Sequence, residues 1–311
     1  LMAKQLGEKP GETVGYRTRL DTRVSVRTRI EVVTEGILNR MIQQDPALED
    51  YAAILFDEFH ERSLQADLGL ALVRESQQAL RDDLRVVVMS ATLDTAPLAR
   101  LLDDAPVLTS EGRAYPVDVH YRPLPPSSHR PPRLPDHVVA VIREALAAQT
   151  GSILTFLPGA GEIRLVERLI RPHLPPNTHL TPLYGQLKGD EQDRAIQPAP
   201  EGQRKIVLAT AIAETSLTID GVRVVIDAGQ ARRAVFDPNS GMTRLTTGRL
   251  SQAAAEQRKG RAGRIEPGVC YRLWSESEQQ GLAAFTAPEI LEADLAPLAL
   301  ELAQWGARDP A

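Results

Sequence analysis

Residues 52–60 read AAILFDEFH, a run of five apolar residues followed directly by an acidic pair. A continuous apolar run of this length is typical of a strand that is buried on both faces of a parallel sheet. Residues 85–89 (RVVVM) have a similar pattern, and the amphipathic segment 63–81 between them predicts a helix. A strand, a helix and a second strand in this order predict a βαβ unit, which places the chain in the α/β class.

Polar side chains follow both of these strands. Parallel sheets bind ligands beyond the carboxyl ends of their strands, and Asp57 and Glu58 follow the first strand. One carboxylate of such a pair can hold Mg²⁺, usually through water, while the other orients or deprotonates a water molecule. Ser90 and Thr92 follow the second strand, where a hydroxyl can bond neighbouring polar groups or simply cap a helix. Acidic pairs at strand ends are common, so these residues alone leave an ordinary structural role open.

A basic segment precedes the acidic pair. Residues 24–33 (VSVRTRIEVV) alternate like a half-buried strand, and residues 34–42 predict a turn and a helix with Thr34 as its N-cap. Arginines cluster around the strand, namely Arg17, Arg19, Arg23, Arg27 and Arg29. Such a cluster beside a helix start can bind phosphate, and a solvated arginine face is the alternative.

The α/β pattern is repeated after residues 110–136, which are rich in proline and glycine, so we place a domain boundary near 112–116. Beyond it the pattern predicts helices at 136–149 and 160–171 and strands at 152–157, 205–209, 223–227 and 269–274. A turn of sequence Asp-Pro-Asn-Ser-Gly predicts a hairpin over 235–245. The last predicted helix covers 288–305, with one apolar face made of Leu291, Leu295, Leu298 and Leu302.

The most basic stretch is QRKGRAGR, residues 257–264. Arg261 and Arg264 are three positions apart, so on one helix turn they would face the same way. Two guanidinium groups side by side suit a polyphosphate, and the small glycines at 260 and 263 would allow a close approach to the backbone. Taken alone, a stretch of this kind is more often a solvated basic face.

Composition bounds the class of protein. The 311 residues are 42% hydrophobic and 25% charged with a net charge of −5, which is typical of a globular protein with two ordinary domains. No apolar window is long enough for a membrane span, and the single cysteine, Cys270, fits the reducing cytoplasm. Residues 231–264 carry eight Lys or Arg against Asp237 and Glu256, so a basic nucleic-acid site is compatible with the acidic total. Aromatic residues make up only 4%, so we expect contacts with the phosphate backbone rather than base stacking.

Five stretches in order resemble the motifs of superfamily-two DEAH-box helicases. They are DEFHERSL (57–64), SATL (90–93), TFLPG (155–159), ATAIAETSLTIDGV (209–222) and QRKGRAGR (257–264). TEG (34–36) resembles a sixth motif of this family. The DEFH form, with Phe59 where the family name has alanine, resembles the bacterial HrpB-type branch in particular.

The resemblance implies two tandem RecA-like domains with parallel sheets and ATP bound in the cleft between them. We expect a first domain at 1–111, a second at 112–285 and the start of a winged-helix region at 286–311. The sequence contains no G-x-x-x-x-G-K-[ST] phosphate loop, and it begins with Leu1 rather than methionine. We therefore expect a first domain that lacks its first strand and helix, with a hydrophobic sheet edge left bare. The parent would be an ATP-dependent RNA helicase, and the chain alone would hydrolyse ATP poorly.

The resemblance also implies roles for individual residues. Asp57 would position Mg²⁺ and Glu58 would activate the attacking water, while His60 would contact Gln257 across the cleft. Ser90 and Thr92 would couple hydrolysis to movement. Gln257, Arg261 and Arg264 would face the γ-phosphate, and Asp220 would face the nucleotide. The nucleic-acid backbone would be contacted by Thr34, Gly159 and Thr210. In this reading the hairpin 235–245 lies near the point of strand separation.

Hypotheses from other classes remain open. A non-catalytic nucleic-acid-binding module with a helicase fold predicts salt-sensitive RNA binding without ATP. A nuclease subunit or a DNA translocase of the same superfamily is a third possibility, which the DEFH and ATAIAETSLTID forms disfavour. The expected partner is single-stranded RNA bound by a monomer, and the choice of RNA over DNA rests on the resemblance alone.

Overall fold

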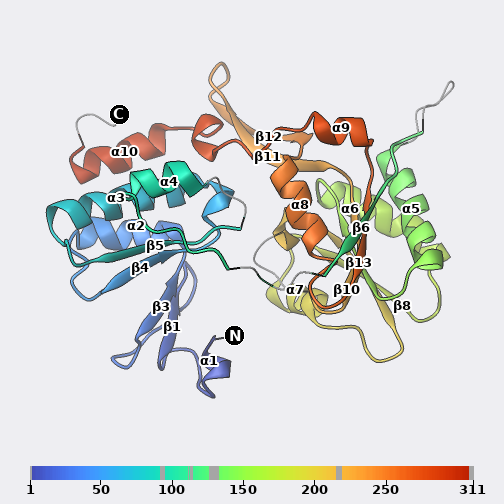
Figure 1. Cartoon of the computed structure of the whole chain (residues 1–311), viewed down its shortest axis with the longest axis horizontal. Coiled ribbons are helices and arrows are strands. Elements are labelled where there is room, and N and C mark those ends of the chain that lie inside the picture. Colours follow the sequence, from blue (N-terminus) through green and yellow to red (C-terminus); the bar gives the residue numbers. More distant parts are fainter. Residues whose placement is uncertain are drawn as a thin grey trace. The chain divides into compact units, whose positions relative to one another are not determined.

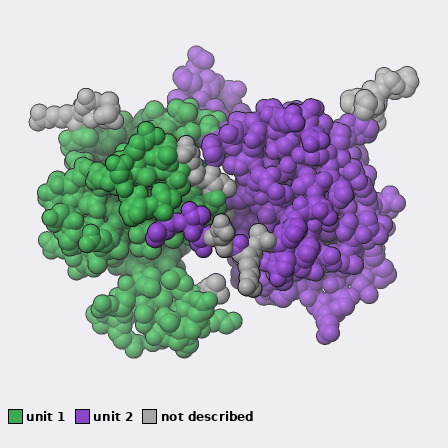
Figure 2. Space-filling view, in the orientation of Figure 1, with its two compact units in different colours: residues 1–107, 287–311 green, residues 108–286 purple. Residues whose placement is uncertain are grey.

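The computed structural model describes residues 2–91, 95–110, 112, 115–125, 133–214 and 219–307. Two compact units make up the chain, as the two colours in Figure 2 show. Unit 1 comprises residues 1–107 and 287–311, and unit 2 comprises residues 108–286. The division at 107/108 lies close to the expected boundary at 111/112, whereas the last 25 residues join the first unit. A winged-helix identity for residues 286–311 stays a prediction.

Unit 1 contains the predicted βαβ unit (Figure 1). Strand β4 (Ala53–Phe56) is followed by helix α3 (Leu64–Ala79) and by strand β5 (Arg85–Val88), which pairs with β4 in parallel. Helix α2 (Glu35–Gln44) packs with α3, and α4 (Thr95–Leu101) follows β5. Leu68, Leu72 and Val73 of α3 lie in the hydrophobic core, as their spacing predicts.

The expectation that β4 and β5 are buried on both faces is wrong for the described chain. Ile54 and Phe56 are buried, but Leu55 and Val87 are 58% and 44% exposed. Burial alternates because the core cluster, which includes α2 and α3 residues, takes up only one face of this two-stranded sheet. In the described residues this sheet therefore exposes apolar side chains on one of its faces, and not only along the edge that was expected to be bare.

A small separate sheet forms the beginning of unit 1. Its order is β2-β1-β3, with β1 at Val14–Arg17, β2 at Thr22–Arg23 and β3 at Ile30–Val33. The predicted strand over 24–33 is wrong in its first six residues. There Ser25 N donates to Thr28 Oγ1 at 2.9 Å, and Thr28 N donates to Ser25 O at 2.9 Å. Local hydrogen bonds of this kind compete with strand pairing.

Unit 2 is built on a six-stranded parallel sheet of order β6-β13-β10-β7-β9-β8. Its strands are β6 (Val117–Tyr121), β7 (Ser152–Phe156), β8 (Thr178–Leu183), β9 (Arg204–Ala209), β10 (Val222–Asp227) and β13 (Gly268–Arg272). Its helices are α5 (Leu134–Ala148), α6 (Ala160–Ile170), α7 (Gly189–Ile196), α8 (Gln252–Gly260) and α9 (Glu276–Gln280). The strands predicted at 152–157, 205–209, 223–227 and 269–274 are all present.

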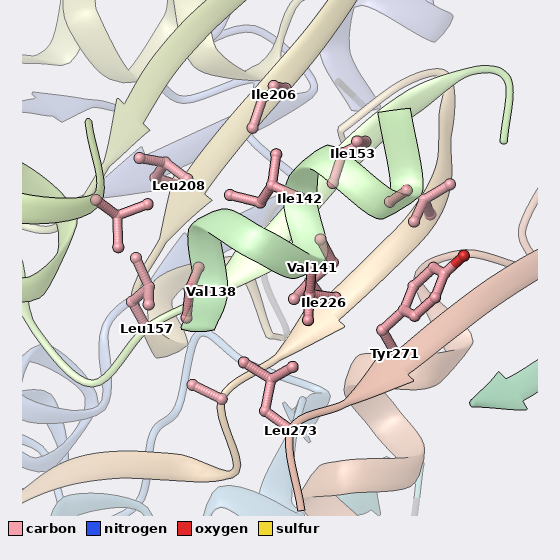
Figure 3. Close-up of a cluster of buried hydrophobic side chains, with 14 of the residues drawn as sticks. Val138, Val141, Ile142, Ile153, Leu157, Ile206, Leu208, Ile226, Tyr271 and Leu273 are labelled. Atoms are coloured by element: carbon pink, nitrogen blue, oxygen red, sulfur yellow. The ribbon is translucent and has the colours of Figure 1, made fainter. Parts of the chain in front are cut away.

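Both faces of this sheet are covered. Ile153 of β7 packs with Val138 and Ile142 of α5 in the cluster that Figure 3 shows. The next residue, Leu154, lies in a second cluster on the opposite face, together with Ala195 of α7 and Ala262 beyond α8. The central strands are therefore buried on both sides, as continuous apolar runs predict.

The predicted hairpin exists and is longer than expected. Strand β11 (Gln230–Asp237) pairs with β12 (Met242–Arg249) in antiparallel register from Gln230↔Arg249 to Asp237↔Met242. The Asp237 carboxylate accepts from Asn239 N at 3.0 Å and from Ser240 Oγ at 2.8 Å. These bonds fix the predicted turn, because an aspartate side chain readily accepts from the backbone two residues on.

The single helix predicted over 288–305 is wrong. A 3₁₀ turn η4 (Glu289–Leu291) is followed by a separate helix α10 (Ala296–Trp305). Pro297 lacks an N–H group and fits only the first turn of a helix, so a new helix starts there. From α10, Leu298, Leu302 and Trp305 pack against the core of unit 1. Among the described residues, no helix is both long enough and apolar enough to cross a bilayer.

We expect Cys270 to resist thiol reagents in the folded protein. It is fully buried on β13, and burial together with the nearby Asp227 carboxylate raises the pKa of its thiol to about 12. Only the thiolate reacts, so at about pH 8 the native chain should not react with Ellman's reagent. Adding guanidinium chloride should release one equivalent of thiol, and fast reaction without denaturant would contradict the burial.

Candidate active site and nucleic-acid interface

The acidic pair lies on a loop held by the end of the neighbouring strand. Phe56 O accepts from Met89 N at 2.7 Å, and Phe59 N donates to Met89 O at 3.1 Å. The Phe59 ring is buried and meets the Phe56 ring edge-on, with centroids 6.1 Å apart. The loop that carries Asp57 and Glu58 is therefore fixed to β5 on both sides of the acidic pair.

The backbone at Glu58 is unusual. Its φ is 51°, in the left-handed region that residues other than glycine rarely adopt. Glu58 N donates to Asp57 Oδ1 at 2.9 Å, and the Asp57 side chain is on the surface. Backbone of this kind is concentrated at functional sites, where surrounding contacts hold it in place.

His60 links the acidic pair to the stretch after β5. Its Nδ1 accepts from Ala91 N at 3.3 Å, so in the neutral ring the proton is on Nε2, which lies 3.4 Å from Glu58 Oε2. Ser90 is exposed beside Ala91, and Thr92 lies outside the described residues. The expected contact between His60 and Gln257 joins two separately described units and stays a prediction.

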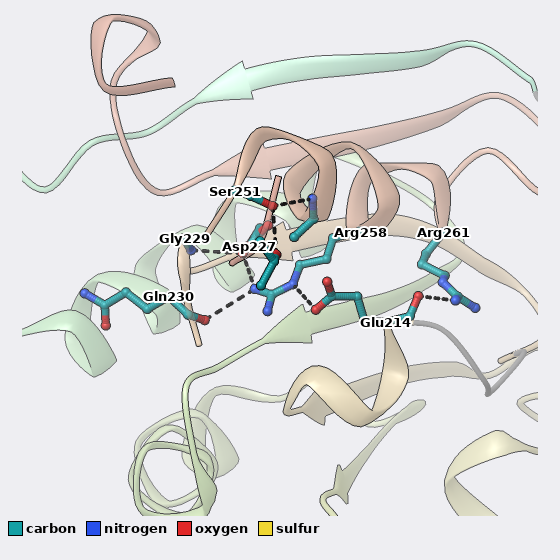
Figure 4. A network of polar contacts seen from close by, with 9 residues as sticks. Glu214, Asp227, Gly229, Gln230, Ser251, Arg258 and Arg261 are labelled. Carbon is teal, nitrogen blue, oxygen red and sulfur yellow. Dashed lines mark hydrogen bonds and ion pairs between the residues drawn. The ribbon is translucent and has the colours of Figure 1, made fainter. Parts of the chain in front are cut away.

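In unit 2 the basic stretch surrounds a buried ion-pair cluster (Figure 4). Arg258 is 1% exposed, and its guanidinium donates to Asp227 Oδ1 at 2.8 Å and to Glu214 Oε2 at 3.0 Å. It also lies over the Phe156 ring, 4.7 Å from the centroid. Burial acts to lower the pKa of Arg258, but the Asp227 and Glu214 carboxylates outweigh it and raise that pKa above its ordinary value.

Arg261 and Arg264 do not share a helix turn, so this part of the prediction is wrong. Helix α8 ends at Gly260, Arg261 is its C-cap, and Arg264 lies beyond it on the surface. Gly263, beyond the end of the helix, packs closely, since a Cβ there would lie 2.6 Å from Tyr115 O. The Arg261 side chain is buried and donates to Glu214 O. A solvated basic face is therefore excluded for Arg258 and Arg261.

Of the other expected site residues of unit 2, Thr210 and Asp220 lie on loops beside the same sheet, and Gln257 lies on a helix. Thr210 follows β9 and its N–H donates to Leu183 O at 3.1 Å. Asp220 is exposed just before β10, at the opposite end of that strand from Asp227, and the residues 215–218 before it lie outside the described ones. Gln257 lies on α8, one position before Arg258.

Two of the expected nucleic-acid contacts stand directly before a helix. Thr34 precedes α2 and Gly159 precedes α6, each with an extended backbone, and neither makes a side-chain capping bond to the described residues. At Gly159 the space of a side chain is taken by Arg232, because a Cβ there would lie 2.5 Å from the Arg232 guanidinium. Arg232 in turn pairs with Glu162 of α6 at 3.1 Å.

Sequence reasoning missed four residues of these sites, namely Glu214, Asp227, Arg232 and Arg258. A signal existed for Asp227, which follows a buried strand just as Asp57 does. For Arg258 the sequence shows only one more cation in a basic run, and its burial became visible in the structure alone. Within the described residues, no three His, Cys, Asp or Glu side chains group as a metal site.

Comparison with known proteins fits this architecture. Residues 136–266 match the family described as "Helicase conserved C-terminal domain". The chain is 53% identical to the ATP-dependent RNA helicase HrpB of Escherichia coli strain K12 over 310 residues, which are 100% of this chain and 38% of that protein. It is 39% identical to HrpA of the same organism over 99% of its length, and 36% identical to human "Probable ATP-dependent RNA helicase DHX34", also over 99%.

A solved structure agrees in fold along the whole chain. The crystal structure of the Escherichia coli DEAH/RHA helicase HrpB superimposes with a TM-score of 0.92 at 52% identity, covering 100% of this chain and 39% of that one. The fold is therefore that of a superfamily-two helicase with RecA-like sheets. More narrowly, the chain belongs to the DEAH/RHA helicases. It spans 38% of the length of HrpB and 24% of the length of HrpA.

Proposed function

We propose that this chain supplies the catalytic carboxylates and arginines of an ATP-dependent RNA helicase, in which ATP hydrolysis is coupled to movement along nucleic acid. The relatives named above are described as ATP-dependent RNA helicases. The observation that carries the proposal is the position of His60, whose Nε2 lies 3.4 Å from Glu58 Oε2 and whose Nδ1 accepts a hydrogen bond from Ala91 N. It joins the water-activating position to the stretch that follows β5, where coupling between hydrolysis and movement is expected.

Asp57 and Glu58 have different roles in this proposal. Asp57 offers one exposed carboxylate at a strand end, which fits a Mg²⁺ ion held mainly by water and nucleotide phosphates. When bound, Mg²⁺ neutralises the charge that develops on the phosphates. Glu58 is half-buried with His60 against its carboxylate, so it can orient the attacking water and accept its proton.

The arginines of unit 2 divide between the γ-phosphate and the protein itself. Arg264 is exposed, and we assign it with Arg261 and Gln257 to the γ-phosphate and Asp220 to the nucleotide. Arg258 is excluded from this role because the Asp227 and Glu214 carboxylates neutralise its buried guanidinium, whereas Arg261 donates to the uncharged oxygen Glu214 O. It instead fixes the direction from which α8 presents its neighbours.

The nucleic-acid backbone is proposed to run past Thr34, Gly159 and Thr210. Helix starts offer N–H groups that have no partner within the helix, and these suit phosphates. The Arg232 guanidinium, which covers Gly159, lies at this place in an ion pair with Glu162. Single-stranded RNA as the substrate, action as a monomer and a cytoplasmic location belong to the same proposal.

ATP turnover of the protein expressed from its complete gene tests the proposal. Turnover should rise when single-stranded RNA is added, and DNA of the same sequence is the matched control for the sugar. Equal stimulation by DNA would remove the RNA assignment. Salt-sensitive RNA binding without any turnover would instead favour a non-catalytic binding module.

A further inference from the structure

The chain that leaves unit 2 caps the start of the arginine-bearing helix. Gln252 N donates to Ala283 O at 2.8 Å, and Ala253 N donates to Ala284 O at 3.1 Å. The Ser251 hydroxyl, which caps α8, lies 3.1 Å from the hydroxyl of Thr286. The first N–H groups of a helix have no partner within it, so residues 283–286 supply what α8 needs at this end.

A few residues further on, the same chain caps the helix that follows the carboxylate loop. Glu289 Oε2 accepts from Leu64 N, the first residue of α3, at 2.7 Å. Glu289 N donates to Arg62 O at 3.0 Å. The Glu289 residue thus bonds to both sides of Ser63, directly after the DEFHER stretch.

The part of the loop that Glu289 contacts is under conformational restraint. Arg62 has a φ of 52°, in the same left-handed region as Glu58. Between them lies the 3₁₀ turn η1 (Phe59–Glu61), in which Glu61 N donates to Glu58 O at 2.9 Å. A backbone of this kind persists only where surrounding contacts hold it, and Glu289 supplies two of these contacts.

Only Ala287 and Pro288 separate the two attachment points. Pro288 has a fixed φ of −57°, so this link can adopt few conformations. Downstream, Leu298, Leu302 and Trp305 anchor α10 on the core of unit 1. A short link between two anchored ends passes on displacement instead of absorbing it.

We propose that Glu289 is a positioning residue for ATP hydrolysis and that residues 283–289, the linking segment, transmit movement between α8 and the carboxylate loop. The linking segment holds α8, which precedes Arg261 and Arg264, at one end and the loop of Glu58 and His60 at the other. This inference rests on the proposed function, because it assigns both ends to one reaction.

Glu289→Ala in the protein expressed from its complete gene tests the role of the side chain. RNA-stimulated kcat should fall about tenfold, because one charge-assisted hydrogen bond to the loop is lost. KM for ATP should stay within about twofold, since Glu289 does not contact the nucleotide in this proposal. Glu289→Gln keeps an oxygen that can accept from Leu64 N, so it should restore most of the turnover.

Glu75→Ala is the matched control. Glu75 accepts from Trp305 Nε1 at 2.8 Å, so this substitution removes a bond to the same C-terminal segment without removing a bond to the carboxylate loop. It should leave kcat unchanged. A second variant with two glycines inserted after Thr286 lengthens the link and should reduce stimulation by RNA while thermal unfolding stays as in the wild type. Wild-type turnover in Glu289→Ala, equal loss in Glu75→Ala, or no rescue by glutamine would overturn the inference. Absence of RNA-stimulated turnover in the wild type would instead refute the proposed function.

Discussion

Replacing Arg258 by methionine should destabilise unit 2 by about 3–5 kcal/mol, because the change leaves two buried carboxylates without their cation. Asp227 is fully buried and Glu214 is largely so, and the side chain of Arg258 bonds to both. Methionine fills most of the same volume over Phe156, so the decrease in the free energy of unfolding would come mainly from removing the positive charge. A domain is stable by only about 5–15 kcal/mol in total, so this is a large share.

Urea unfolding of the 311-residue chain, followed by far-UV circular dichroism, measures this change. Arg264→Met is the matched control, since it makes the same substitution on the surface of the same motif. The control should unfold within about 0.5 kcal/mol of the wild type, as most surface substitutions do. If Arg258→Met and Arg264→Met unfolded at the same urea concentration, the buried ion pairs of Arg258 would not stabilise unit 2 as predicted.

The same Arg264→Met variant should lose about 10³–10⁵-fold in ATP turnover in the protein expressed from its complete gene. A guanidinium that reaches the γ-phosphate stabilises charge that develops only in the transition state, so kcat should fall while nucleotide binding changes little. Rapid-quench turnover and titration with a fluorescent nucleotide separate the two effects. Arg143→Met, on the exposed side of α5, is the control and should turn over like the wild type.

Together the two arginine variants would separate scaffolding from chemistry within one eight-residue stretch. Arg258→Met would lower the free energy of unfolding, and Arg264→Met would lower ATP turnover without changing the free energy of unfolding. A loss of turnover in Arg264→Met that came with an equal loss of stability would assign Arg264 to the scaffold, and the proposed division would then be wrong.

The sequence allowed good predictions where a pattern is set by the sheet itself. The central strands of unit 2 contain continuous apolar runs, and Ile153 and Leu154 of β7 are buried on opposite faces as that pattern predicts. In unit 1 the same kind of run misled, because Leu55 and Val87 are apolar but exposed. An apolar run indicates that both faces of a strand are suited to burial. Whether both faces are buried depends on which other elements pack against the sheet.

Local hydrogen bonds and close packing explain the other errors. The alternation over 24–33 was interpreted as a strand, but the Ser25 and Thr28 side chains bond to the backbone there. The spacing of Arg261 and Arg264 was interpreted as one helix turn, but Gly263 packs against Tyr115 and the chain leaves the helix. Neither effect has a periodic pattern that the sequence could display.

For the site, the sequence indicated the residue types and their order, but not which of them are buried. Asp57, Glu58 and His60 occur on one loop, as their adjacency requires, and the structure adds the bond from Ala91 to His60. Arg258 shows the limit of the sequence, because a buried and an exposed arginine have the same letter. Its partners Glu214 and Asp227 are 44 and 31 positions away.

Glu58→Gln in the protein expressed from its complete gene tests whether Glu58 activates the attacking water. Glutamine keeps the shape and an oxygen that can accept from His60 Nε2, but it cannot take a proton from water. RNA-stimulated ATP turnover should therefore fall by about 10²–10⁴-fold, while ATP binding and RNA binding stay as in the wild type. Turnover equal to that of the wild type would contradict the assignment of Glu58, and with it the account of this loop as the catalytic centre.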